Sequence, residues 1–222
     1  MIVTIDGPAG TGKSTVARRL AEELGFQFLD TGAMYRMVAL QSIRQQLTLT
    51  SDEEIRCLTE SSQFDLSGGR YLLDGVDVSQ EIRTTEVARA ASFVAQIPSV
   101  RTLLVQRQRE FAAERNVVCE GRDQGTVAFP YAECKFYLTA APAERARRRV
   151  TELQASGKDV DFDELLKEQT ARDQRDAGRE ASPLRPANDA ILVDTTSLEL
   201  EDVVNTLREL ILNHPAFQHS QL

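Results

Sequence analysis

The sequence has few of the features that mark secreted or membrane-spanning proteins. Its three cysteines, Cys57, Cys119 and Cys134, are scattered among 222 residues and form no CxxC pair. An odd, sparse set of thiols makes a poor disulfide framework and a poor metal cage, and it predicts a reducing compartment. No run approaches the ~18 apolar residues of a membrane helix. No basic and apolar leader precedes the first predicted strand. We therefore expect a soluble, cytoplasmic protein.

Basic charge is also in deficit, since 26 Lys and Arg residues face 34 Asp and Glu residues for a net charge of −8. Proteins that bind nucleic acids or membrane surfaces draw their affinity mainly from Lys and Arg. The balance therefore predicts neither nucleic acid nor membrane as a partner. A small anionic ligand stays possible, because a local basic cleft can lie inside an acidic surface. Lysine is rare among the cationic residues, so arginine would have to supply such a cleft.

Short apolar runs alternate with stretches of helical spacing. Helical stretches are predicted at residues 13–24, ending at Gly25, and at about 33–47. A last helix is predicted to begin near Thr196, whose spacing to Glu199 fits a capping box. Such alternation implies an α/β fold with a parallel sheet covered on both faces. The predicted strands are residues 2–5, 26–29, 117–119, 135–138 and 191–193.

One segment, between about residues 49 and 98, breaks this alternation. Residues 64–75 predict a hairpin that turns at Gly68-Gly69, with a second turn near Asp74-Gly75. A small antiparallel element inside an α/β chain indicates an inserted subdomain. No internal repeat or low-complexity tract accompanies it.

A phosphate-binding loop follows the first predicted strand. Residues 7–14 match GxxxxGK[ST] in full and lie between a predicted strand and a predicted helix, which is the context that this motif requires. Its glycines let backbone N–H groups turn inward around an anion, and the next helix directs its positive end at the phosphates. Lys13 is expected to contact the β- and γ-phosphates of ATP, and Ser14 to ligate Mg²⁺, whose other ligands are water and phosphates. The predicted ATP-binding residues are Gly7, Pro8, Ala9, Gly10, Thr11, Gly12, Lys13, Ser14 and Thr15.

The rest of the chain narrows the kind of nucleotide-binding protein. No Asn-Lys-x-Asp of a guanine-reading GTPase occurs, and the strand at 117–119 is too short for a typical motor ATPase. Arginines gather at residues 145–149 and 172–179, with Asp176 among them. A solvated helix with ion pairs would account for any one of them. Together they suit a kinase that gathers the phosphates of two nucleotides, because guanidinium forks spread and neutralise that charge.

A second candidate segment, Asp30 to Arg36, follows the second predicted strand, at the sheet edge where α/β proteins bind ligands. It supplies a carboxylate, an aromatic ring in Tyr35 and a phosphate-binding fork in Arg36. The alternative is structural, with Thr31 as a helix N-cap and Tyr35 in the core.

The whole chain resembles the bacterial cytidylate kinase family of nucleoside-monophosphate kinases. Besides the phosphate-binding loop, which many kinases share, four more specific stretches carry the resemblance, at residues 29–36, 77–84, 120–127 and 172–176. The chain departs from the family pattern in three places. Thr31 stands where Ser is common and keeps the hydroxyl, Gln80 replaces a Gly, and Glu120 replaces an Asp.

The resemblance implies a P-loop NTPase fold with a five-stranded parallel sheet and helices on both faces. It also implies a single domain over residues 1–222, with a monophosphate-binding insertion at about 31–100 and a short lid at about 145–180. The implied reaction transfers phosphate from ATP to CMP or dCMP in a monomeric enzyme. The residues implied at the monophosphate site are Asp30, Thr31, Tyr35, Arg36, Ser92, Arg101, Arg122, Asp123, Arg172, Asp176 and Arg179.

The resemblance also assigns roles within that set. Arg36, Arg101 and Arg122 would hold the monophosphate, while Ser92 and Asp176 would contact the pyrimidine and, for Asp176, the sugar hydroxyls. The residues implied in catalysis are Lys13, Arg122, Asp123, Arg172 and Arg148.

Two other functions stay open at this point. One is another small P-loop kinase, specific for shikimate or preferring uridylate, although the insertion argues against shikimate. The other is a nucleotide-binding regulator without catalysis, against which the presence of Lys13, Arg122, Asp123 and Arg172 argues.

Overall fold

The computed structural model describes residues 1–49, 51–66, 69–155, 157 and 159–219. The chain forms two compact units. The first consists of Met1–Phe28 and Glu114–Leu222, and the second of Leu29–Ala113. No helix of the described part is long and apolar enough to cross a bilayer. The three cysteines are free thiols; Cys57 is exposed, whereas Cys119 and Cys134 are buried.

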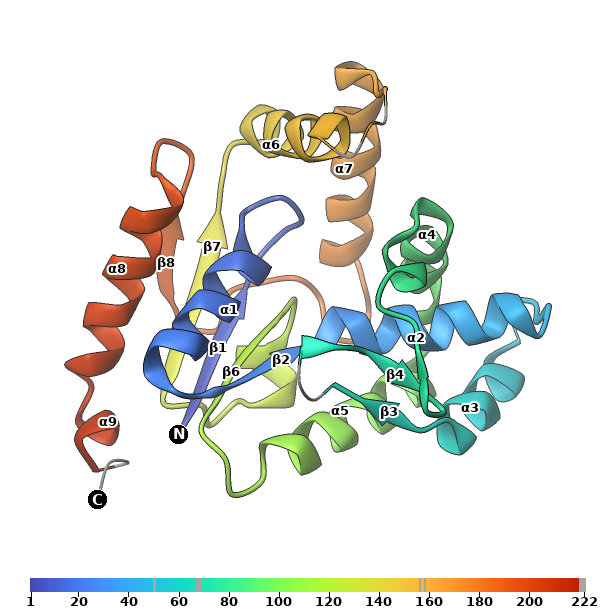
Figure 1. Ribbon diagram of the computed structural model, residues 1–222, viewed down its shortest axis with the longest axis horizontal. Coiled ribbons are helices and arrows are strands. Elements are labelled where there is room, and N and C mark those ends of the chain that lie inside the picture. Colours follow the sequence, from blue (N-terminus) through green and yellow to red (C-terminus); the bar gives the residue numbers. More distant parts are fainter. Residues whose placement is uncertain (50, 67–68, 156, 158, 220–222) are drawn as a thin grey trace. The chain divides into compact units, whose positions relative to one another are not determined.

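A five-stranded sheet with the order β2-β6-β1-β7-β8 organises the first unit (Figure 1). Strand β1 pairs in parallel with both β6 and β7, and β7 pairs in parallel with β8. This confirms the predicted α/β class and the parallel sheet. Its strands are β1 (Ile2–Asp6), β2 (Gln27–Asp30), β6 (Val117–Gly121), β7 (Cys134–Thr139) and β8 (Ile191–Asp194).

Helices α1 (Lys13–Leu24) and α8 (Leu200–Leu212) pack against each other and bury their apolar residues against the sheet. The fully buried Leu20 and Leu207 join Ile5 of β1 in this core. Helix α1 ends as predicted, because Gly25 adopts the left-handed conformation with φ 68°. The turn η3 (Gln124–Ala128) also contacts β1.

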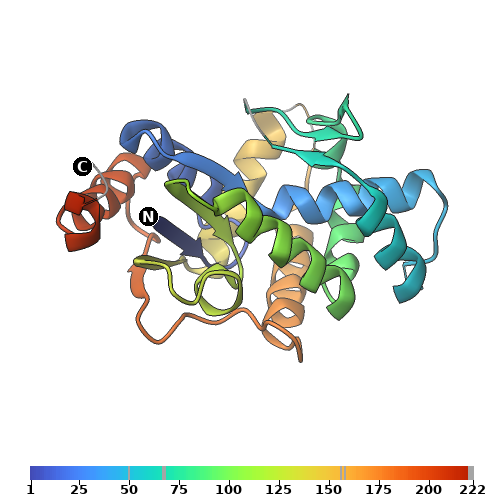
Figure 2. The same ribbon diagram turned by 90° about the horizontal axis from the view of Figure 1, so that it is seen from below.

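The remaining helices of the first unit are α6 (Pro142–Ala155), α7 (Phe162–Ala177) and α9 (Pro215–His219). Helices α6 and α7 contact each other extensively, and α9 contacts α8. Figure 2 shows that the N-terminus leads directly into β1.

In the second unit, α2 (Thr31–Arg44) contacts α3 (Asp52–Ser61), α4 (Thr85–Val94), α5 (Pro98–Ala112) and the short η2 (Glu81–Arg83). A separate antiparallel sheet contains β3 (Phe64–Asp65), β4 (Leu72–Leu73) and β5 (Val76–Asp77). Asp74 and Gly75 both have positive φ, at 51° and 81°, which confirms the second predicted turn. The other predicted turn includes Gly68, which lies outside the described residues.

Two helix starts differ from the prediction. Helix α8 begins at Leu200 and not near Thr196, because the Thr196 hydroxyl donates to the carboxylate of Asp194 and accepts from the N–H of Ala141. Thr196 therefore belongs to the turn after β8, and no capping box forms. Helix α2 begins at Thr31, two residues before the predicted start. Its N-cap is Asp30, whose carboxylate accepts from the N–H of Ala33 at 2.8 Å.

Candidate active site

The loop between β1 and α1 has a backbone that only glycine can adopt at two close approaches. Gly7 has φ 143°, and a Cβ there would lie 2.1 Å from the carbonyl oxygen of Leu138. Gly10 has φ 82°, and its Cβ would lie 3.0 Å from that of Arg145. Positive φ values in such a loop turn backbone N–H groups toward one point, and α1 starts directly after it. The loop therefore has the local geometry of an anion cradle.

Lys13, the first residue of α1, is only 4% exposed. Its Nζ donates to the carbonyl oxygen of Pro8 at 2.6 Å and lies 3.5 Å from the hydroxyl oxygen of Thr11. Burial, and then the positive charge of Arg122, lower the pKa of Lys13 to about 7. A buried ammonium next to a second cation gains most from an anion, so this position suits a polyphosphate.

Two buried carboxylates beside the loop are functional candidates that sequence reasoning missed. Glu120, at the end of β6, accepts a hydrogen bond from the Ser14 hydroxyl at 2.8 Å. Asp6, at the end of β1, accepts from the N–H groups of Gln124 and Gly125 at 2.9 and 2.8 Å. Burial raises the pKa of Asp6 to about 7. Both residues end neighbouring parallel strands, which was the available signal, since ligands bind at that sheet edge.

A divalent cation fits this part of the structure chemically. The Ser14 hydroxyl and the Glu120 carboxylate, 2.8 Å apart, offer the hard oxygen ligands that Mg²⁺ prefers. Among the described residues, no group of three or more His, Cys, Asp or Glu side chains forms a cage for a metal ion. Mg²⁺ with few protein ligands, retaining water and substrate phosphates, is the kind of ion that such a pair accommodates.

The first unit joins two of the predicted acceptor-site arginines through one buried carboxylate. Asp176 of α7 is 1% exposed and accepts from Arg122 Nε at 3.1 Å and from the guanidinium of Arg179. Burial acts to lower the pKa of Arg122, but Asp176 and Glu120 outweigh it and the net shift is upward. Asp176 therefore orients both guanidinium groups and stabilises the positive charge of Arg122.

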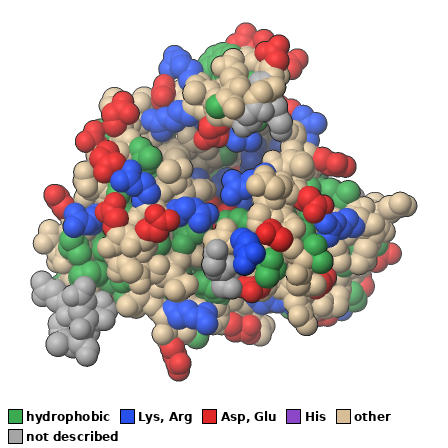
Figure 3. All heavy atoms as spheres, viewed as in Figure 1, with side chains coloured by type: hydrophobic (Ala, Val, Ile, Leu, Met, Phe, Trp, Pro, Cys, Tyr) green, Lys and Arg blue, Asp and Glu red, His purple; other side chains and the backbone are tan. Residues whose placement is uncertain are grey.

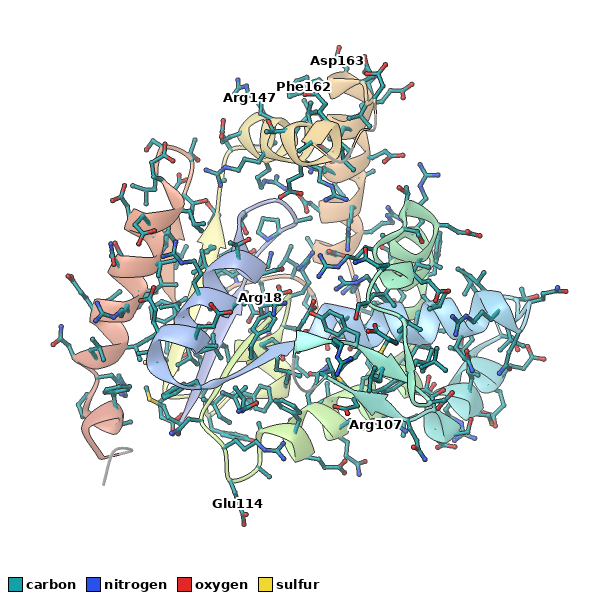
Figure 4. All side chains as sticks on the ribbon, in the orientation of Figure 1. Arg18, Arg107, Glu114, Arg147, Phe162 and Asp163 are labelled. Carbon is teal, nitrogen blue, oxygen red and sulfur yellow. The ribbon has the colours of Figure 1, made fainter. Side chains whose placement is uncertain are left out.

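The arginines of α6 differ in role, although they are adjacent in sequence. Arg145 is buried and donates to the carbonyl oxygen of Ala9 at 3.0 Å and to Asp173 Oδ2 at 2.6 Å, so it ties α6 and α7 to the phosphate-binding loop. Arg147 and Arg149 form exposed ion pairs within the helix. Arg147 projects away from the loop in Figure 4. These two fit the alternative of a solvated helix.

Three predicted catalytic residues lie on different elements of the first unit. Arg148 donates to Glu144 at 3.3 Å and to the hydroxyl of Thr195 at 3.1 Å, so it contacts the turn after β8. Arg172 of α7 is close enough to Lys13 to lower its pKa. Asp123, between β6 and η3, is 3% exposed.

The second unit holds a separate group of predicted acceptor-site residues. Asp30 accepts a hydrogen bond from Arg36 Nη2 at 2.9 Å. The guanidinium of Arg101 lies over the ring of Tyr35, with its Cζ 5.5 Å from the ring centroid. Arg101 is 4% exposed and also donates to the carbonyl oxygen of Ala95 at 3.1 Å. The buried hydroxyl of Ser92 has no hydrogen-bond partner within the described residues. The buried Thr31, 2% exposed, completes the set.

Charge is distributed differently on the surface and inside. The face in Figure 3 shows acidic and basic side chains interspersed, without an extended basic area. Two cationic side chains of the predicted site, Lys13 and Arg101, are instead buried, as is Arg145 beside the phosphate-binding loop. The excess of acid is therefore compatible with local binding of small anions.

The model of the family described as cytidylate kinase matches residues 3–213. The chain belongs to the cytidylate kinase family. A curated cytidylate kinase of Caldanaerobacter subterraneus subsp. tengcongensis is 49% identical over 209 residues, covering 94% of this chain and 93% of the relative. A cytidylate kinase of Vibrio cholerae serotype O1 is 46% identical over 214 residues, covering 95% of each chain.

A solved structure supports the fold independently of close sequence similarity. Shikimate kinase from Bacteroides thetaiotaomicron matches with a TM-score of 0.50 at 18% identity, covering 95% of this chain and 98% of the other. At that identity the likeness concerns the fold alone, and it agrees with the P-loop kinase architecture expected from the sequence.

Proposed function

We propose that this member of the cytidylate kinase family transfers the γ-phosphoryl group of ATP to CMP or dCMP, giving ADP and CDP or dCDP. The single observation that carries the proposal is the buried Lys13 at the glycine-lined loop of a chain that is 46–49% identical to curated cytidylate kinases. The loop supports a triphosphate donor, and the relatives support cytidylate as the acceptor.

The donor nucleotide is proposed to bind at the loop of residues 7–15. Its phosphates would accept hydrogen bonds from backbone N–H groups of the loop and from Lys13. The buried ammonium of Lys13 would then gain an anionic partner. Ser14, with Glu120 behind it, would hold Mg²⁺, which neutralises charge on the phosphates when bound. Arg148 and Arg172 are proposed to reach the transferring phosphoryl group.

The second unit, Leu29–Ala113, is proposed to be the monophosphate-binding part, and α6 with α7 the lid. Arg36 and Arg101 would hold the acceptor phosphate as guanidinium forks. The Ser92 hydroxyl, which is buried and without a partner among the described residues, suits a contact to a polar edge of cytosine. From the first unit, Arg122, Asp123, Asp176 and Arg179 are proposed to complete acceptor binding.

The chemical step demands little covalent work from the protein. An oxygen of the acceptor phosphate attacks the γ-phosphorus, the bond to the β-phosphate oxygen breaks, and ADP leaves. The acceptor phosphate is largely ionised near neutral pH, so no general base is needed. Positioning and stabilisation of charge by Lys13, Arg122 and Arg172 supply the rate. The enzyme is proposed to act as a monomer.

A turnover panel with ATP and Mg²⁺ tests this proposal. We expect CMP and dCMP to be the preferred acceptors among CMP, dCMP, UMP, AMP and shikimate, by at least about tenfold in kcat/KM. A preference for UMP, AMP or shikimate would replace the proposed acceptor. Binding of ATP without transfer to any acceptor would identify a nucleotide-binding regulator instead.

A further inference from the structure

Tyr71, the residue directly before β4 of the inserted sheet, contacts a residue that the proposed function places in the acceptor site. Its hydroxyl donates to Asp30 Oδ2 at 3.0 Å, across 41 residues of sequence, and both residues are buried. Tyr71 is itself anchored in the insertion, because its N–H donates to Ser79 Oγ at 3.0 Å and its carbonyl accepts from Val78 N–H at 2.9 Å. The insertion and the start of α2 are therefore joined by a side-chain hydrogen bond.

The carboxylate of Asp30 accepts hydrogen bonds from donors of different kinds. Oδ1 accepts from the N–H of Ala33 at 2.8 Å, which caps α2. Oδ2 is shared by Arg36 Nη2 at 2.9 Å and by the Tyr71 hydroxyl at 3.0 Å. The cap fixes one oxygen, and Tyr71 fixes the rotation that places the other. The direction in which Asp30 holds the Arg36 guanidinium therefore depends on Tyr71.

The guanidinium of Arg36 has N–H groups available for a further acceptor. Nη2 donates to Asp30 Oδ2, while the buried Nε has no hydrogen-bond partner within the described residues. Gly32 leaves room for this fork, since a Cβ there would lie 3.1 Å from Arg36 Nη1 and 3.3 Å from Asp30 Oδ1. A phosphate oxygen is a matching acceptor for the remaining N–H groups.

We infer that Tyr71 is a positioning residue for acceptor binding, which acts through Asp30 to orient the Arg36 guanidinium toward the acceptor phosphate. The inference rests on the proposed function and extends it into the insertion. Tyr71 touches no reacting atom in this arrangement. Its hydroxyl serves to keep the Arg36 fork in the orientation that binds a monophosphate.

The test is Tyr71→Phe, which removes the hydroxyl and keeps the ring. We expect the KM for CMP to rise about tenfold, with kcat and the KM for ATP changed less than about twofold, because one hydrogen bond to a charged group is lost. Tyr131→Phe is the matched control, since Tyr131 is 65% exposed and lies outside the proposed site. It should leave all three constants unchanged.

A double-mutant cycle with Arg36→Lys separates positioning from general support of the fold. If Tyr71 acts through the Arg36 fork, Tyr71→Phe should change the KM for CMP less than twofold once Arg36 is Lys. Additive effects, an unchanged KM for CMP in Tyr71→Phe, or equal losses toward ATP and CMP would each overturn the inference. Failure of the unaltered protein to phosphorylate CMP would instead overturn the proposed function, and with it this role.

Discussion

The two compact units hold their candidate phosphate-binding groups by different means. In the first unit, the anion cradle is a contiguous loop whose shape follows from glycine backbone and from the start of α1. In the second, Asp30, Tyr71 and Arg101 come from separate elements and are fixed by side-chain contacts. A backbone cradle tolerates changes of side chain outside its glycines. A side-chain network depends on each of its members.

The first unit also carries the larger electrostatic strain. Lys13 and Asp6 are both buried there. Burial lowers the pKa of Lys13 and raises that of Asp6, to about 7 in both cases, because it disfavours the charged form of each. In the second unit, the carboxylate of Asp30 accepts from a backbone N–H, a tyrosine hydroxyl and a guanidinium. The buried ammonium of Lys13 in the first unit therefore gains more from a bound anion. In the second unit, Asp30 and Arg36 are already held in place before binding.

The largest effect should follow from Lys13→Met, which removes the charge at the centre of the cradle. We expect kcat to fall by about 10³-fold or more, because the lost donor is the one proposed to contact the transferring phosphates. The KM for CMP should change less than about threefold, because Lys13 is not among the residues proposed to bind the acceptor. Steady-state kinetics with each substrate varied measure both.

Lys167→Met serves as the control for that loss, because Lys167 is exposed on α7. It should retain full activity. A near-normal kcat for Lys13→Met would rule out the assigned role of the loop, and a large rise in the KM for CMP would show that Lys13 also contributes to acceptor binding.

The contrast between a contiguous loop and a network of distant side chains also explains which features could be predicted from the sequence. The loop at residues 7–14 and helix α1 were predictable to the residue, because a contiguous pattern and Gly25 encode their geometry locally. The bond from Tyr71 to Asp30 leaves no such pattern, since a contact between distant elements has no characteristic spacing. The start of α8 was missed for a related reason. The Asp194 side chain competes for Thr196, and local side-chain bonds of that kind override a capping motif.

Candidate residues show the same division. The motifs predicted the arginines as a group, but they could not distinguish the buried Arg145 from the exposed Arg147, two positions away on the same helix. Which side of α6 is covered depends on its packing against α7. Glu120 was noted only as a departure from the family pattern. Its bond to Ser14 needs the register of β1 and β6 to be known.

Glycine substitutions compare the two kinds of construction directly. In the first unit, Gly7→Ala should lower the free energy of unfolding by about 3 kcal/mol, because the new Cβ would lie 2.1 Å from the fixed carbonyl oxygen of Leu138 at a φ of 143°. In the second, Gly32→Ala meets the movable end of Arg36 at 3.1 Å. It should change stability by less than about 1 kcal/mol and raise the KM for CMP about threefold to tenfold.

Gly25→Ala controls for backbone strain alone, since Gly25 has φ 68° and no atom within 4 Å of its Cβ position. It should cost about 1 kcal/mol. Urea unfolding of the three variants measures the series. Equal losses for Gly7→Ala and Gly25→Ala would mean that the close approach to Leu138 does not constrain the loop.

The smallest expected effect is the uptake of a fraction of a proton when ATP binds, and it tests the lowered pKa of the buried Lys13 in the first unit. With a pKa of about 7, Lys13 is mostly neutral at pH 8 in the free protein. Bound phosphates favour the ammonium and raise that pKa, so ATP with Mg²⁺ should bind with proton uptake at pH 8 and with much less at pH 6, where Lys13 is already charged. Calorimetry at pH 8 in buffers of different ionisation enthalpy should then give a binding enthalpy that rises with the ionisation enthalpy of the buffer.

Two controls test the assignment to Lys13. Lys13→Met should abolish most of the proton uptake, and binding of CMP alone should produce little. If the slope persists in Lys13→Met, the proton is taken up elsewhere, and Asp6 is a buried acid near the loop whose pKa an anion would raise.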